Sequence, residues 1–199
     1  MSELTREDEE FQMLREWAGK LTGEINYAKK SGKKINVRVR SGLITQGVIS
    51  EHIQNHDFSV SQNGVSITPS TKKIHLLVLK NGVNPDKKYS HNEVHTVVEI
   101  RNNAVGDIVR KTREKFEEIK NLTKVNRFAV VVLSENPKYL RRYTKENTEF
   151  LFTCILRERT PKQLYNVDVI EDMLENHELS KTGEWEKLIN YLKKPTNTP

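Results

Sequence analysis

Three residues near the middle of the chain have side chains that could act together on a metal ion or a phosphate group. They are His75, Glu99 and Arg101, and they lie in the segment Lys73–Asn102, KIHLLVLKNGVNPDKKYSHNEVHTVVEIRN. A carboxylate such as that of Glu99 is a ligand for hard divalent cations, whereas a neutral imidazole prefers softer metals such as zinc or copper. The guanidinium of Arg101 keeps its charge and could stabilise a phosphate, but it is a poor general base.

The same segment predicts how these residues are held. Two apolar stretches, IHLLVLK and HTVVEIR, flank a polar, turn-rich connection, which indicates two paired strands. If they pair antiparallel about a turn centred near residue 87, His75 lies opposite Glu99, and the inner pairs are Leu77 with Val97 and Leu79 with His95. Residues two apart in a strand point to the same face. Arg101 therefore joins the other two at one end of the hairpin.

This hairpin resembles the catalytic hairpin of the PD-(D/E)xK, or restriction-endonuclease-like, superfamily of metal-dependent nucleases. The resemblance covers about residues 10–156 and implies an α/β sandwich with a mixed central β-sheet flanked by helices. It implies that Glu99 binds a divalent metal, Mg or Mn, and that the Ile100 carbonyl adds a ligand. Two positions depart from the family pattern. His75 stands where the family has its metal-binding aspartate, and Arg101 stands where it has a lysine.

The two departures predict a weakened site, because losing one carboxylate should reduce magnesium binding severely. In this family a glutamate often comes from the first helix, and the resemblance makes Glu24 the candidate, with Glu16 second. In some relatives the lysine comes from a neighbouring element, and Lys111 on the next helix is available for that role. The resemblance thus gives His75, Glu99, Arg101 and Glu24 as candidate catalytic residues, and Glu99, Ile100 and His75 as candidate metal ligands.

Two other interpretations of this stretch remain. Pro85-Asp86 matches the first letters of the family name, but Asp86 falls six residues beyond Lys80, the end of the first strand. At about 3.3 Å per residue, that separation places Asp86 more than ~15 Å from Glu99, so Asp86 is interpreted as a turn residue. The second interpretation treats both strands as ordinary core strands, with Glu99 and Arg101 forming an ion pair at a strand end.

Hydrophobic periodicity predicts the elements around the hairpin. Apolar residues at three- and four-residue steps predict helices near residues 6–30 and 105–122. Alternation predicts a β-hairpin from INVRVR and ITQGVIS, and Asn63-Gly64 predicts a tight turn between two short strands. The remaining predictions are strands at 127–134 and 149–156, short helices at 136–142, 169–174 and 184–193, a loop at 157–166, and a disordered tail at 195–199. Residues 1–194 are expected to form a single domain.

Charge is unevenly distributed in this chain of 199 residues, whose formal net charge is +6. Basic residues gather without acids in AKKSGKKINVRVR and again in KYLRRYTK. Such clusters can neutralise phosphates and give salt-sensitive affinity for nucleic acid, although charge alone favours an ordinary solvated surface. The candidate nucleic-acid-binding residues are Lys29, Lys30, Lys33, Lys34, Arg38, Arg40, Arg141 and Arg142.

Several classes of protein are disfavoured. The phosphate-binding loop and dinucleotide motifs are absent, and the single cysteine, Cys154, cannot form an intrachain disulfide. No apolar run approaches the ~20 residues needed to span a bilayer, and the acidic start MSELTREDEE does not resemble a secretory signal. A cytoplasmic protein without a membrane partner is expected.

The leading hypothesis is a nucleic-acid-associated protein with a degenerate metal site and weak or lost phosphodiesterase activity. DNA is its expected partner. One alternative is an active metal-dependent endonuclease that hydrolyses DNA phosphodiester bonds. Another is a non-catalytic scaffold or interaction protein. A homodimer is compatible with each of these hypotheses.

Overall fold

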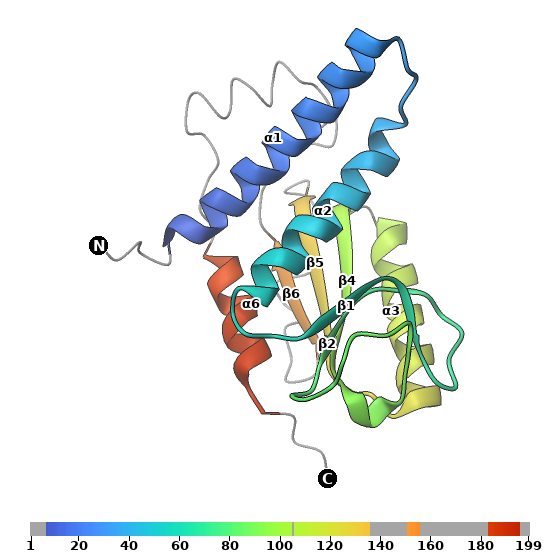
Figure 1. Ribbon diagram of the computed structural model, residues 1–199. Helices are drawn as coiled ribbons and strands as arrows, with labels where there is room; N and C mark the ends of the chain where they lie inside the picture. Colours follow the sequence, from blue (N-terminus) through green and yellow to red (C-terminus); the bar gives the residue numbers. More distant parts are fainter. Residues whose placement is uncertain (1–6, 105, 136–150, 156–182, 196–199) are drawn as a thin grey trace.

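The chain folds around a mixed β-sheet with helices on both faces (Figure 1). The computed structural model describes residues 7–104, 106–135, 151–155 and 183–195. The helices are α1 (Glu7–Ser31), α2 (Val37–Gln54), α3 (Gly106–Thr123), α6 (Glu184–Lys193) and the short 3-10 helix η1 (His91–Glu93). The strands are β1 (Val60–Ile67), β2 (Ile74–Leu79), β3 (Lys88–Tyr89), β4 (Val94–Ala104), β5 (Phe128–Glu135) and β6 (Leu151–Ile155). Their order in the sheet is β3-β1-β2-β4-β5-β6.

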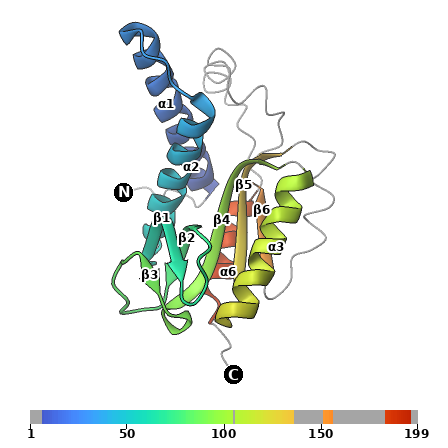
Figure 2. The same ribbon diagram turned by 90° about the vertical axis from the view of Figure 1, so that its right-hand side faces the viewer.

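Strand β4 separates the hydrophobic core into two layers, because its side chains alternate between the faces of the sheet. Val98 and Ile100 pack with Trp17 in the layer formed by α1, α2 and α6, whereas Val97 packs with Phe116 in the layer formed by α3. Figure 2 shows α1 and α2 on one side of the sheet and α3 on the other. Strand β4 pairs antiparallel with β2 and parallel with β5. The predicted α/β sandwich with a mixed central sheet is therefore confirmed.

Most of the predicted elements are present within about two residues of their expected limits, namely α1, β2, α3, β5, β6 and α6, whereas β4 continues three residues beyond its predicted end. The predicted helices at 136–142 and 169–174, the loop at 157–166 and residues 196–199 of the predicted tail lie outside the described residues. In the described ranges, no helix combines the length and the apolar character needed to cross a bilayer.

The β-hairpin predicted from INVRVR and ITQGVIS is wrong, because this stretch forms helix α2. Asn36 caps the helix, and its side-chain oxygen accepts a hydrogen bond from the Val39 N–H at 3.2 Å. The buried residues of α2 include four polar ones, Ser41, Thr45, Ser50 and His52. Thr45 Oγ1 donates to the Ser41 carbonyl at 2.7 Å, so this hydroxyl is satisfied inside the helix. These polar residues concealed the helical period, while the alternation of VRVR imitated a strand.

The predicted turn at Asn63-Gly64 is also wrong, because these residues form a bulge within the single strand β1. Asn63 and Gly64 have φ values of 69° and 77°, in the left-handed region that Asn and Gly adopt most readily. The register with β2 shifts between Gln62 and Val65, so two residues of β1 stand opposite His75. A bulge bends its strand and redirects neighbouring side chains. This bulge lies directly beside the first candidate residue.

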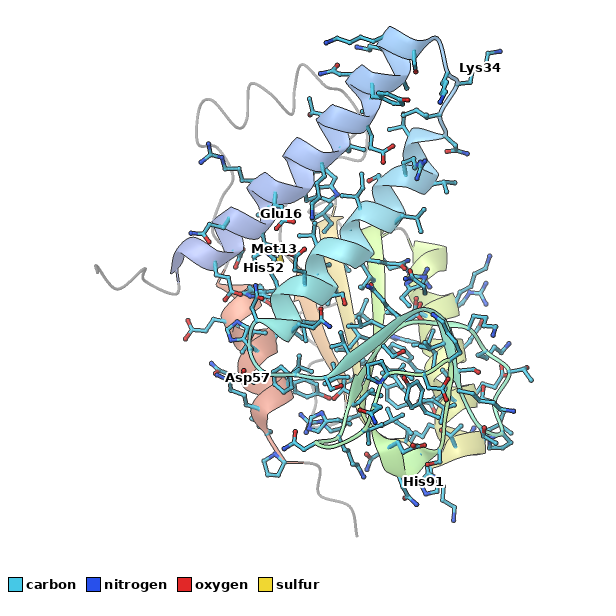
Figure 3. All side chains as sticks on the ribbon, viewed as in Figure 1. Met13, Glu16, Lys34, His52, Asp57 and His91 are labelled. Carbon is cyan, nitrogen blue, oxygen red and sulfur yellow. The ribbon has the colours of Figure 1, made fainter. Side chains whose placement is uncertain are left out.

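Two histidines, one in the last turn of α2 and one just after it, connect this end of α2 to α1. His52 Nδ1 lies 3.3 Å from Glu9 Oε1 and His52 Nε2 lies 3.2 Å from Glu16 Oε2, while His56 Nε2 lies 2.8 Å from Glu9 Oε2. The ring of Trp185 from α6 meets the His52 ring edge-on, with 6.3 Å between centroids. Burial alone would lower the pKa of His52, but its hydrogen bonds to both carboxylates outweigh burial and raise that pKa. Figure 3 shows His52 and Glu16 close together between the helices.

We expect the charge on His52 to make stability depend on pH. Because the folded-state pKa is raised, the stability contributed by the imidazolium is fully present below the unfolded pKa of about 6.5 and is lost as the pH rises through the folded value. His52→Gln should therefore be less stable than the unaltered protein near pH ~6, and the difference should shrink at alkaline pH. Urea unfolding of both proteins across this range measures the difference. His91→Gln in η1 serves as the control, and a pH-independent effect of His52→Gln would contradict this assignment.

Candidate functional site

The antiparallel pairing of β2 with β4 decides where the candidate residues meet. The predicted pair Leu77–Val97 is confirmed. The predicted pair Leu79–His95 is wrong, because the ladder is irregular just before Leu79, which pairs with Val94 instead. This irregularity lies at the turn end of the hairpin. It leaves the register intact at the opposite end, where the candidate residues lie.

Glu99 forms the centre of a buried charge cluster on the α3 face of the sheet. Its side chain is 0% exposed, its Oε1 is in contact with Lys115 Nζ, and its Oε2 lies 3.0 Å from Arg101 Nη2. The backbone N–H of His75 donates to Oε1 at 3.4 Å. Removing a carboxylate from water is costly unless opposite charges and hydrogen-bond donors surround it. The structure thus brings His75, Glu99 and Arg101 together, as predicted, and adds Lys115.

The ring of His75 is held as a neutral hydrogen-bond donor. Its Nδ1 accepts a hydrogen bond from the Ile100 N–H at 3.1 Å. Burial lowers the pKa of His75, and the charges of Arg101 and Lys115 lower it further against the opposing effect of Glu99. In the neutral ring whose Nδ1 is an acceptor, the proton resides on Nε2. Neither ring nitrogen then has a free lone pair for a metal.

Arg101 bridges the cluster to helix α3. Its Nη2 contacts Glu99 and also donates to Thr112 Oγ1 at 3.3 Å. Its Nε is buried and has no hydrogen-bond partner among the described residues. The side chain as a whole is 27% exposed. Arg101 is therefore positioned by Glu99 and Thr112, while part of its donor capacity stays unused.

Lys115 is the site residue that sequence reasoning missed. It contacts Glu99 from α3, whereas the predicted alternative, Lys111, is exposed one turn earlier. The signal that could have identified it is helical spacing, because Lys115 lies three residues after Thr112 and four before Ile119, both of which are buried. A lysine on the buried face of an amphipathic helix requires a buried partner.

The carboxylates predicted from helix α1 do not reach this cluster. Glu24 Oε2 lies 3.5 Å from Arg40 Nε, and Glu16 contacts His52 and Lys20. Helix α1 packs in the layer on the opposite face of the sheet from Glu99. A metal ion bound by Glu99 could not also be bound from that layer. The structure therefore corrects the assignment of Glu24, and of Glu16 as its substitute.

Asp86 behaves as the sequence predicts for a turn residue. It lies in the loop between β2 and β3, where its Oδ1 accepts a hydrogen bond from the Lys87 N–H at 2.6 Å. Its carbonyl accepts hydrogen bonds from Ser61 Oγ at 2.7 Å and from Tyr89 Oη at 2.9 Å. These contacts give Asp86 a structural role in holding the loop against β1 and β3.

The donor set around Glu99 does not fit a hard divalent cation. Magnesium and manganese bind anionic and carbonyl oxygens, and the only carboxylate that the described residues bring here is already in contact with Arg101 and Lys115. Ile100 lies in the β4–β5 ladder opposite Val131, and its carbonyl as a ligand stays a prediction. Across the described ranges, no three His, Cys, Asp or Glu side chains are grouped so that they could hold a metal ion.

The far ends of α1 and α2, residues 24–43, project beyond the sheet as a helical hairpin that we call the arm (Figures 1 and 2). Tyr27 on the arm is 61% exposed, and Lys33 Nζ lies 5.5 Å from its ring centroid. Lys34 is at its tip (Figure 3). The exposed basic residues of the arm are Lys29, Lys30, Lys33, Lys34 and Arg40.

Three other candidate nucleic-acid-binding residues lie partly or wholly outside the described residues. Arg38 belongs to α2, but its side chain is not described, and Arg141 and Arg142 fall outside the described ranges.

The arm is linked to the charge cluster through strand β4. Asn102 Nδ2 donates to Ser41 Oγ at 2.7 Å, so the base of the arm is fixed to the residue that follows Arg101.

Comparison with known proteins identifies the fold. No family model matches the chain, and no curated protein matches it in sequence. Among solved structures, NucC of E. coli MS115-1 in its cAAA-bound form aligns with a TM-score of 0.52 at 11% identity, covering 78% of this chain and 77% of that one. NucC of P. aeruginosa ATCC27853, also cAAA-bound, aligns with a TM-score of 0.47 at 9% identity, covering 90% and 97%. The first alignment shows that the chain has the restriction-endonuclease-like fold.

Lys115 should contribute strongly to stability because it neutralises a buried charge. Lys115→Met leaves Glu99 with Arg101 as its remaining cation, and we expect the free energy of unfolding to fall by about 3 kcal/mol. Lys111→Met is the matched control, because this lysine is exposed on the same helix and its loss should change stability by less than about 0.5 kcal/mol. Urea unfolding of the two variants gives the comparison. Equal effects would mean that the contact with Glu99 contributes nothing.

Proposed function

We propose that this is a nucleic-acid-associated protein of the restriction-endonuclease-like fold whose phosphodiesterase activity is weak or lost, with DNA as its partner. The observation that carries the proposal is the state of Glu99. Its carboxylate is fully buried and is neutralised by Arg101 and Lys115. A metal-dependent nuclease instead needs carboxylate oxygens that are free to bind the metal.

The three residues around Glu99 oppose hydrolysis in different ways. His75 provides an N–H donor where a second metal-binding oxygen is needed, because its Nδ1 is occupied by the Ile100 N–H. Arg101 does not deprotonate and cannot activate water as a general base. Lys115 is the compact ammonium of the cluster, but it contacts Glu99 directly. Weak or absent metal-dependent cleavage follows from this arrangement.

The arm supports association with nucleic acid. Lys33 lies beside the exposed ring of Tyr27, and an exposed aromatic ring beside a cation can stack on a base while the cation contacts a phosphate. The arm begins at the same end of β4 as the charge cluster, through the bond between Asn102 and Ser41. The electrostatic part of such binding is independent of sequence.

Salt dependence tests the arm. The triple variant Lys29→Gln, Lys33→Gln, Lys34→Gln should bind duplex DNA more weakly. Its slope of log affinity against log salt should be reduced by about 0.9 for each phosphate that the protein no longer neutralises. Fluorescence anisotropy at several salt concentrations measures this slope. The charge-matched control removes exposed lysines elsewhere, at Lys88, Lys120 and Lys193, and should leave the slope unchanged. If the unaltered protein binds neither DNA nor RNA at low salt, the scaffold hypothesis replaces this one.

Cleavage tests the state of the site. With magnesium, the unaltered chain should cleave plasmid DNA poorly or not at all. His75→Asp would place a second carboxylate beside Glu99, and its like-charge repulsion should make magnesium stabilise this variant but not the unaltered protein. The double variant His75→Asp, Arg101→Lys should cleave best, because it also supplies a compact ammonium. Plasmid nicking and thermal unfolding, each with and without magnesium, provide the two readouts.

Glu99→Ala in the unaltered background is the control for cleavage. Robust magnesium-dependent cutting by the unaltered chain that Glu99→Ala abolishes would contradict the proposal. That result would identify an active metal-dependent endonuclease instead, with a carboxylate that lies outside the described residues completing its site.

A further inference from the structure

We propose that His75, Arg101 and Lys115 form a metal-independent binding site for a phosphate group. This inference rests on the proposed association with nucleic acid for its physiological ligand, but the site itself can be tested with inorganic phosphate alone. It follows from a mismatch at the hairpin of β2 and β4. The family resemblance implies a metal there, whereas this chain places hydrogen-bond donors around a single, already neutralised carboxylate.

Solvent reaches the three nitrogen-bearing side chains of the cluster but not its carboxylate. The side chains of His75 and Arg101 are each 27% exposed and that of Lys115 is 17% exposed, whereas Glu99 between them is 0% exposed. A metal would have to reach Glu99, whereas an anion only has to reach the groups around it. The exposure of the cluster therefore favours an anion.

The three nitrogen-bearing side chains of the cluster are hydrogen-bond donors, which also favours an anion. His75 has its proton on Nε2, because Nδ1 accepts from the Ile100 N–H. Arg101 and Lys115 are donors and carry no acceptor when charged. All three groups therefore present N–H bonds, which are complementary to phosphate oxygens and unsuited to a cation. Arg101 would use Nη1 towards a phosphate oxygen, because its Nη2 contacts Glu99 and Thr112 and its Nε is buried.

The cluster carries a surplus of positive charge on side chains that are already positioned. Two cations, Arg101 and Lys115, stand against one carboxylate. Glu99 holds both cations, and Thr112 also holds Arg101, at 3.3 Å. Because Glu99 and Thr112 hold these side chains, an anion would meet donors that are already in place, and less conformational entropy would be lost on binding.

Histidine NMR gives a direct test. We would titrate protein labelled with 15N-histidine with inorganic phosphate at neutral pH, in EDTA, replacing chloride to keep the ionic strength constant. The expected result is a saturable shift of the His75 Nε2 resonance, assigned with His75→Gln. Arg101→Gln should weaken phosphate binding at least tenfold, as expected for losing charged hydrogen bonds, and Lys111→Gln should not change it. No saturable shift would overturn the proposal.

Two further variants guard against misfolding and against the metal alternative. Arg101→Lys retains the charge and the pairing with Glu99 but loses the guanidinium's second amino group, so it should fold and bind with intermediate affinity. Glu99→Gln removes the group that competes for the cations and should strengthen phosphate binding. If magnesium or manganese binds saturably without EDTA, and Glu99→Gln removes that binding, the site is a metal site and the proposal fails.

DNA binding identifies the source of the phosphate. In EDTA, Arg101→Gln should reduce the salt slope for duplex DNA by about 0.9 if the site holds a backbone phosphate. If inorganic phosphate binds but the DNA slope is unchanged, the ligand is a free phosphate or a phosphorylated small molecule. If the protein binds phosphate but not DNA, the proposed function is wrong and the phosphate site stands. If the protein binds DNA through the arm alone and does not bind phosphate, the phosphate site is wrong and the proposed function stands.

Discussion

A carboxylate that is completely buried can remain ionised only where the protein surrounds it with positive charge, and Glu99 imposes this requirement on the centre of the fold. Three elements meet it. Strand β4 supplies Arg101 from its own next position on the same face, α3 supplies Lys115, and β2 supplies the backbone N–H of His75. The packing of α3 on the sheet is therefore fixed by charge as well as by the apolar contacts of Phe116.

The alternation of side chains along β4 links this cluster to the arm. Arg101 points into the α3 layer, and the side chain of the next residue, Asn102, donates a hydrogen bond to Ser41 at the base of the arm. One strand end thus holds a cationic cluster on one face and a basic helical arm on the other. This arrangement needs no contact between the two basic surfaces. The alternation of side chains along β4 alone places them at the same end of this strand, on opposite faces of the sheet.

The hairpin could be predicted from sequence because strand pairing depends on local patterns. The two apolar runs, together with the rule that residues two apart in a strand point to the same face, were enough to place His75, Glu99 and Arg101 together. Helix α2 could not be recognised, because its buried face contains Ser41, whose hydroxyl is satisfied by a residue distant in sequence. The left-handed backbone at Asn63-Gly64 could be predicted from the residue types. Whether it forms a turn or a bulge could not, because both structures favour Asn and Gly.

The site was only partly predictable, because the missing pieces depend on how layers pack. Helical spacing indicates that Lys115 lies on the buried face of α3, but only the placement of α3 over β4 selects Glu99 as its partner. The expectation for Glu24 failed for the converse reason, since α1 covers the opposite face. A family resemblance carries over residue types, and it cannot specify which face a helix covers in a particular chain.

The departures from the family pattern are physically coupled. An aspartate at position 75 would place two carboxylates together, and their repulsion would require a bound metal or a proton. With a neutral histidine there, Glu99 is offset by Arg101 and Lys115 alone. The cluster therefore has no electrostatic need of a divalent cation. The residue at position 75 thus decides whether Glu99 has a second carboxylate beside it or only hydrogen-bond donors and cations.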